Sequence, residues 1–187
     1  MILEQIARDT EIRVTNQKKK VPLGTLKKAA YSMETETGFP FEKALAKEGL
    51  SFICEVKKAS PSKGIIAEDF PYLDIAREYE AAGADAISCL TEPKYFLGRD
   101  SYLKEIAETV KIPVLRKDFV VEEYQIYEAK VLGAGAVLLI CALIEPELLK
   151  RYIQVCDTLG LSALVEAHDE KANLPCCVGG SQSHWRK

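Results

Sequence analysis

Residues 113–140 read PVLRKDFVVEEYQIYEAKVLGAGAVLLI, and this stretch decides the predicted fold. Its pattern predicts a strand over Pro113–Leu115 and a second strand over Val137–Ile140. Between them, Glu122–Leu132 has the character of a helix, and Gly133 follows as a common helix stop. Both strands are continuous apolar runs, which is typical of parallel strands that are buried on both faces. The stretch is therefore one strand–helix–strand unit of an α/β protein.

The same order of elements extends in both directions along the chain. Further strands are predicted at Ser51–Val56, Ala86–Leu90 and Ser162–Val165, and further helices at Tyr72–Ala82, Tyr102–Val110 and Pro146–Leu159. Polar helices are predicted before the first strand, over residues 2–20 and in one or two pieces over residues 24–48. Five strands that alternate with helices predict a parallel sheet, which is either doubly wound or curled into a barrel.

Charged residues at the ends of the strands favour the barrel. The first strand ends with Glu55 and Lys57 on one face, the third with Arg116–Phe119 and the fifth with Glu166. A barrel would point side chains from alternate strands into one mouth, whereas a doubly wound sheet would spread them along an edge. The first strand is also not followed by GxGxxG, which weakens the nucleotide-binding alternative. A structural ion pair could explain one pair of charges, but three such strand ends indicate the acids and bases of an active site.

The composition excludes several classes of protein. The 187 residues carry a formal net charge of −3, and this mild acidity argues against a nucleic-acid binder. No apolar run is long enough to cross a bilayer, and the polar N-terminus does not have the pattern of a signal peptide. No Cys/His cluster has the spacing of a metal site. Cys54, Cys89, Cys141 and Cys156 lie in apolar segments, so we expect buried free thiols and a cytoplasmic protein.

Four motifs carry a resemblance to a known family. They are FICEVKKASPSKG at residues 52–64, LTEPKYFLG at 90–98, PVLRKDFVV at 113–121 and LVEAHDE at 164–170. Their order and spacing resemble those of the indole-3-glycerol-phosphate synthases, from the N-terminus to about Leu174. The resemblance implies a (β/α)8 TIM barrel with an N-terminal helical extension that packs near the mouth. It also implies a lyase of tryptophan biosynthesis, a decarboxylase that closes an indole ring with loss of carbon dioxide and water.

The resemblance further implies roles for individual residues. The substrate would be 1-(2-carboxyphenylamino)-1-deoxyribulose 5-phosphate, and the reaction needs a proton donor at its ketone and positive charge near its anionic groups. Lys117 would be the main general acid, and Lys57 would bind the substrate and share the role of acid. Glu166 would be the general base or its partner, and Glu55 would orient Lys57. Ser60 would hydrogen-bond the substrate, and Phe96 and Phe119 would pack against its aromatic ring.

The implied partners are few. The resemblance points to a phosphorylated small molecule and to no nucleic acid, membrane, metal or organic cofactor, and it leaves the oligomeric state open. For the two phenylalanines, plain core packing is the alternative interpretation. A different phosphate-binding barrel, such as a sugar-phosphate isomerase, is disfavoured by the set of Glu55, Lys57, Lys117 and Glu166.

The sequence departs from the family at its C-terminal end. About five β/α units are present, whereas a complete barrel has eight. We therefore divide the chain into a helical extension at residues 1–48, a partial barrel at 49–174 and an aberrant tail at 175–187. Allowed codons can be chosen for the tail such that a reading frame shifted by one base encodes a segment similar to the one that leads into the sixth strand in the family. We therefore expect a frameshift near Pro175. A chain that lacked the phosphate-binding half would be an inactive fragment of the enzyme.

Overall fold

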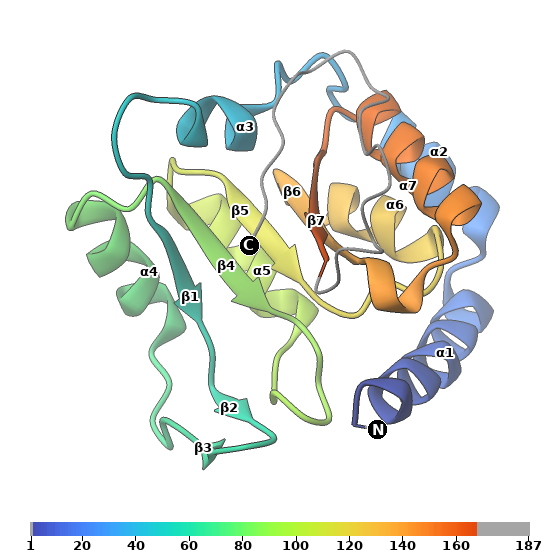
Figure 1. The fold of residues 1–187 in the computed structure, drawn as a ribbon, viewed down its shortest axis with the longest axis horizontal. Coiled ribbons are helices and arrows are strands. Elements are labelled where there is room, and N and C mark those ends of the chain that lie inside the picture. Colours follow the sequence, from blue (N-terminus) through green and yellow to red (C-terminus); the bar gives the residue numbers. More distant parts are fainter. Residues whose placement is uncertain (1, 168–187) are drawn as a thin grey trace.

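The sheet follows the order of the chain. In a computed structural model, which describes residues 2–167, five parallel strands lie in the order β1-β4-β5-β6-β7 (Figure 1). They are β1 (Ile53–Val56), β4 (Ala86–Leu90), β5 (Val114–Lys117), β6 (Ala136–Ile140) and β7 (Ser162–Glu166). A doubly wound sheet would reverse its strand order, so this strictly sequential order agrees with the predicted partial barrel. The predicted tail at residues 175–187 lies outside the described residues.

Four helices cover the outer face of the sheet. They are α4 (Tyr72–Ala81), α5 (Asp100–Thr109), α6 (Tyr124–Val131) and α7 (Pro146–Thr158), each of which follows a strand (Figure 1). Alternate strand residues, among them Val56, Ile87 and Leu139, point toward these helices and are almost completely buried in the main core. The predicted helices are therefore confirmed, with ends that differ by one or two residues.

The inner face of the sheet is closed at the N-terminal ends of its strands. The short helix α3 (Pro40–Leu45) lies across this end (Figure 1). Its Phe41 and Leu45 pack against Ala86, Leu115 and Ala136, which are early inner-face residues of three strands. Because α3 covers this end, the chemistry-bearing residues of the inner face gather at the C-terminal ends of the strands.

The N-terminal extension contains two further helices. The predicted helix at residues 2–20 is confirmed as α1 (Ile2–Lys20), and α2 (Leu23–Tyr31) packs against α6. The segment after α2 is held by Thr37, whose hydroxyl donates to the carbonyl of Gly160 at 2.7 Å. A Cβ at Gly160 would lie 2.1 Å from the carbonyl oxygen of Thr35, so only glycine fits there. No helix within residues 2–167 combines the length and apolar character needed to cross a membrane.

Two small elements were not predicted. A hairpin of β2 (Ala59–Ser60) and β3 (Gly64–Ile65) follows β1, and a short 3-10 turn, Cys141–Leu143, follows β6. The expectation of free thiols is confirmed for Cys54, Cys89 and Cys156. Cys89 and Cys156 are buried as expected, whereas Cys54 and Cys141 are only half-buried.

Candidate active site

Three charged side chains meet on the inner face of β1 and β5. In the strand register, Glu55 of β1 pairs with Ser88 of β4, and Ser88 pairs with Leu115 of β5. Lys117 lies two residues beyond Leu115 and therefore on the same face of the sheet. The ammonium of Lys117 lies 2.9 Å from Glu55 Oε2, and Lys57 donates a hydrogen bond to Glu55 Oε1. The side chains of β1 and β5 therefore meet across β4, as the predicted barrel geometry requires.

The carboxylate of Glu55 is shared by two lysines. Burial alone would raise its pKa, but hydrogen bonds and charges from Lys57 and Lys117 outweigh burial and lower the pKa below its ordinary value. Glu55 is therefore ionised at neutral pH. Because two ammonium groups face one carboxylate, the cluster offers surplus positive charge to an anionic ligand.

A cavity of about 180 Å³ adjoins this cluster at the C-terminal ends of the strands. Its lining consists of Leu3, Leu90, Phe96, Lys117, Asp118, Phe119, Leu138, Ile140 and Glu166. The rings of Phe96 and Phe119 lie side by side in its wall, tilted by 37° with centroids 6.0 Å apart. An apolar cavity of about 150 Å³ is large enough for a benzene ring. The space is therefore suited to one aromatic ring that is flanked by an amine and a carboxylate.

Most of the predicted site residues lie together. Lys117, Glu166, Phe96 and Phe119 line the cavity, and Lys117 joins it to Glu55 and Lys57. Ser60 is the exception, because it lies in the β2–β3 hairpin and is not part of the lining. Its hydroxyl accepts a hydrogen bond from the backbone N–H of Lys63 at 3.3 Å and so stabilises the hairpin in this structure.

The expectation that all charged residues of the third strand end share one mouth is wrong for Arg116. This side chain is fully buried on the helix side of the sheet. It bonds Asp100 of α5 at 2.8 Å, Glu128 of α6 at 2.7 Å and the carbonyl of Gln125 at 3.1 Å. One residue along a strand reverses the direction of the side chain, so Arg116 and Lys117 point to opposite faces.

A contact between α1 and the sheet was missed in the sequence. Arg13 donates to Asp118 Oδ1 at 2.8 Å, and Thr91 donates to Asp118 Oδ2 at 2.8 Å. Burial alone would raise the pKa of Asp118, but the guanidinium groups of Arg13 and Arg116 lower it. Leu3, also from α1, lines the cavity, which confirms that the extension lies at the mouth. Arg13 is 105 residues from Asp118 in the chain, so no local pattern indicates the pair.

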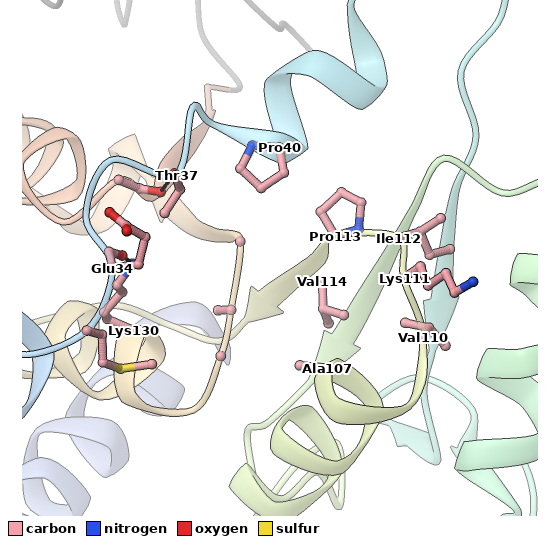
Figure 2. A pocket seen from close by; sticks show the side chains of 15 residues that line it. Glu34, Thr37, Pro40, Ala107, Val110, Lys111, Ile112, Pro113, Val114 and Lys130 are labelled. Carbon is pink, nitrogen blue, oxygen red and sulfur yellow. Dashed lines mark hydrogen bonds between the residues drawn. The ribbon is translucent and has the colours of Figure 1, made fainter.

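A larger cavity of about 360 Å³ lies at the opposite end of the strands. Figure 2 shows Glu34, Thr37 and Lys130 on one side of it and Pro113 and Val114 on the other. Lys130 donates to the carbonyl of Glu34 at 2.5 Å, and burial lowers the pKa of this lysine. None of the predicted site residues lines it. The smaller cavity is therefore the candidate active site, because the acids, bases and aromatic walls gather there.

Comparison with known proteins gives a consistent family. Residues 3–175 match the family model described as indole-3-glycerol phosphate synthase. The chain is 57% identical over 182 residues to the protein of that name from Ruminiclostridium cellulolyticum, covering 97% of the chain and 70% of the relative. It is 53% identical to the one from Endomicrobium trichonymphae, covering 91% and 66%. With the protein from Clostridium acetobutylicum, the identity is 45% over 97% of the chain and 69% of the relative. The chain thus spans roughly two thirds of the length of these relatives.

Proposed function

The chain belongs to the indole-3-glycerol phosphate synthase family, and we propose that its cavity binds the carboxyphenylamino ring of the family's substrate. The reaction would be the carboxy-lyase step that converts 1-(2-carboxyphenylamino)-1-deoxyribulose 5-phosphate to indole-3-glycerol phosphate. The observation that carries the proposal is the ion pair between Lys117 and Glu55 beside an aromatic-walled cavity that also contains Glu166. This set supplies an acid, a base and a ring site within one space.

We assign Lys117 the role of general acid. It lines the cavity and its ammonium is held by Glu55 at 2.9 Å, so a ligand bound there would meet a lysine in a supported position. In the first step, the ring carbon that carries the carboxylate attacks the ketone carbon, and Lys117 donates a proton to the ketone oxygen. Carbon dioxide then leaves, and the electron pair of the broken bond restores the aromatic ring.

Glu166 is our candidate for the second half of the reaction. The new hydroxyl must leave as water, and this step needs a proton donor to the oxygen and a base for the ring proton. Glu166 ends β7 level with Ile140 and lines the cavity with Lys117. We assign it the role of base, with Lys117 or Lys57 as the acid.

The remaining predicted residues support binding. Lys57 shares the carboxylate of Glu55 and adds positive charge for the carboxylate of the substrate. Phe96 and Phe119 bound the space for the aromatic ring. Ser60, in the β2–β3 hairpin outside the cavity lining, would hydrogen-bond a part of the substrate that extends beyond the cavity. The phosphorylated end of the substrate would extend out of the described cavity.

The test is turnover of the synthetic substrate by the purified protein, followed by the absorbance of the indole product. Because Lys117 lines the cavity and Lys57 does not, we expect Lys117→Ala to lower kcat by about 10²- to 10⁴-fold, the range for loss of a general acid. Lys57→Ala should cause a smaller loss. Lys104→Ala is the matched control, since this lysine is exposed on α5 and pairs with Glu108 at 3.9 Å. Near-normal turnover by Lys117→Ala would contradict the assignment.

A further inference from the structure

One buried carboxylate organises the loop between β4 and α5. Glu92 lies two residues after the end of β4 and is only 2% exposed. Its Oε1 accepts the backbone N–H of Lys94 at 3.0 Å, and its Oε2 accepts those of Tyr95 at 2.6 Å and Phe96 at 3.0 Å. Three hydrogen bonds from consecutive backbone N–H groups to one buried side chain hold this backbone firmly.

The loop has little other freedom. After Phe96, Leu97 has a φ of 53°, in the left-handed region that side chains other than glycine rarely adopt. The N–H of Gly98 then donates to the carbonyl of Glu92 at 2.8 Å. A Cβ at Gly98 would lie 2.4 Å from the carbonyl oxygen of Leu90, so the loop packs directly on the end of β4. The backbone on both sides of Phe96 is therefore constrained.

We propose that Glu92 is a positioning residue for ligand binding. By holding the backbone of residues 94–96, its carboxylate sets the direction of the Phe96 ring, which lines the cavity beside the ring of Phe119. Glu92 itself does not line the cavity and acts through Phe96. The inference rests on the proposed function, because it assigns Glu92 a part in binding the aromatic ring of that substrate.

The test compares Glu92→Gln with the unaltered protein. Glutamine has nearly the same shape as glutamate, but its NH₂ group is only a donor and cannot accept a hydrogen bond from a backbone N–H. The substitution therefore removes at least one of the three hydrogen bonds that hold residues 94–96. Hydrogen exchange should become faster at the amides of residues 94–96. The Kd for 2-aminobenzoate, an aromatic probe with a carboxylate, should rise about tenfold, as should KM, while kcat changes less than about threefold.

Glu80 provides a matched control. Its Oε1 accepts the backbone N–H groups of Lys111 at 2.6 Å and Ile112 at 3.2 Å, at the opposite end of the sheet. Glu80→Gln should loosen that segment and leave Kd and KM unchanged. In a Phe96→Leu background, adding Glu92→Gln should change Kd by less than about twofold, because the ring that Glu92 positions is already absent.

The outcomes separate the two proposals. The inference is overturned if 2-aminobenzoate does not bind, if Glu92→Gln binds it normally, if Glu80→Gln weakens it equally, or if the effect persists in the Phe96→Leu background. If Glu92→Gln weakens the probe but the unaltered protein does not turn over the synthetic substrate, the proposed function fails and the positioning role stands.

Discussion

The carboxylate of Glu55 has two lysines as partners, and this arrangement affects its protonation. Because hydrogen bonds from Lys57 and Lys117 outweigh the effect of burial, the pKa of Glu55 is below its ordinary value. Lys117→Met removes one partner while keeping most of the apolar stem. We expect the pKa of Glu55 to rise in this variant, as measured by carbon-13 NMR titration of the side-chain carboxyl. Lys104→Met is the control, and an unchanged Glu55 titration in Lys117→Met would show that the ion pair is weak in solution.

Single residues also show what could be predicted from the sequence. The alternation of a strand is enough to place Glu55 and Lys57 on one face, and their contact confirms this. The same rule places Arg116 on the face opposite Lys117, although the charges at that strand end suggested one common mouth. Glu92 is part of the motif at residues 90–98, but its hydrogen bonds depend on how the following backbone turns, which the sequence pattern does not specify.

At the scale of elements, α1 is attached to the sheet by a few specific contacts. Arg13 reaches Asp118 at the end of β5, and Asp9 accepts hydrogen bonds from Lys94 at 2.8 Å and from the hydroxyl of Tyr95. The first contact adjoins Lys117 and the second adjoins Phe96. The helix therefore supports both sides of the candidate site. The periodicity of residues 2–20 predicts the helix itself, whereas its docking depends on contacts that are distant in sequence.

Arg13→Ala should loosen this helix. The variant removes a charged donor from the buried carboxylate of Asp118, which keeps Thr91, Arg116 and the backbone N–H of Phe119, and we expect the free energy of unfolding to fall by about 2 kcal/mol. Limited trypsin digestion should cut within residues 2–20 faster than in the unaltered protein. Arg8→Ala, an exposed position on the same helix, is the control. Equal cleavage rates in the two variants would mean that Arg13 does not hold the helix.

At the scale of the whole molecule, the sequential order of β1-β4-β5-β6-β7 follows from the repeated strand–helix units of the sequence. Short connections bring each strand beside the one before it, and the α3 helix closes one end of the inner face. The residues of the candidate active site meet at the other end, although their positions in the chain range from Glu55 to Glu166. This convergence is a property of the topology, and for that reason the charged residues at the strand ends predict the location of the site from the sequence.

Acid should destabilise the whole molecule. Several carboxyls have lowered pKa values because they are paired in the fold: Asp9, Glu55, Asp85, Asp118 and Glu123. The unfolded chain binds these protons at higher pH than the folded chain does, so the stabilisation is present above the ordinary values of 3.8 and 4.5. It is lost as the pH falls through the lowered values.

Glu128 and Asp157 act in the opposite direction, because burial raises their pKa values. The carboxyls with lowered pKa values outnumber these two, so we expect the free energy of unfolding in urea to fall as the pH drops below about 4.5. High salt should weaken the contribution of the exposed pair between Asp9 and Lys94 and leave that of buried Asp118 largely intact. Stability that rose on acidification would mean that the raised carboxyls dominate and that the ion pairs described above contribute little to folding.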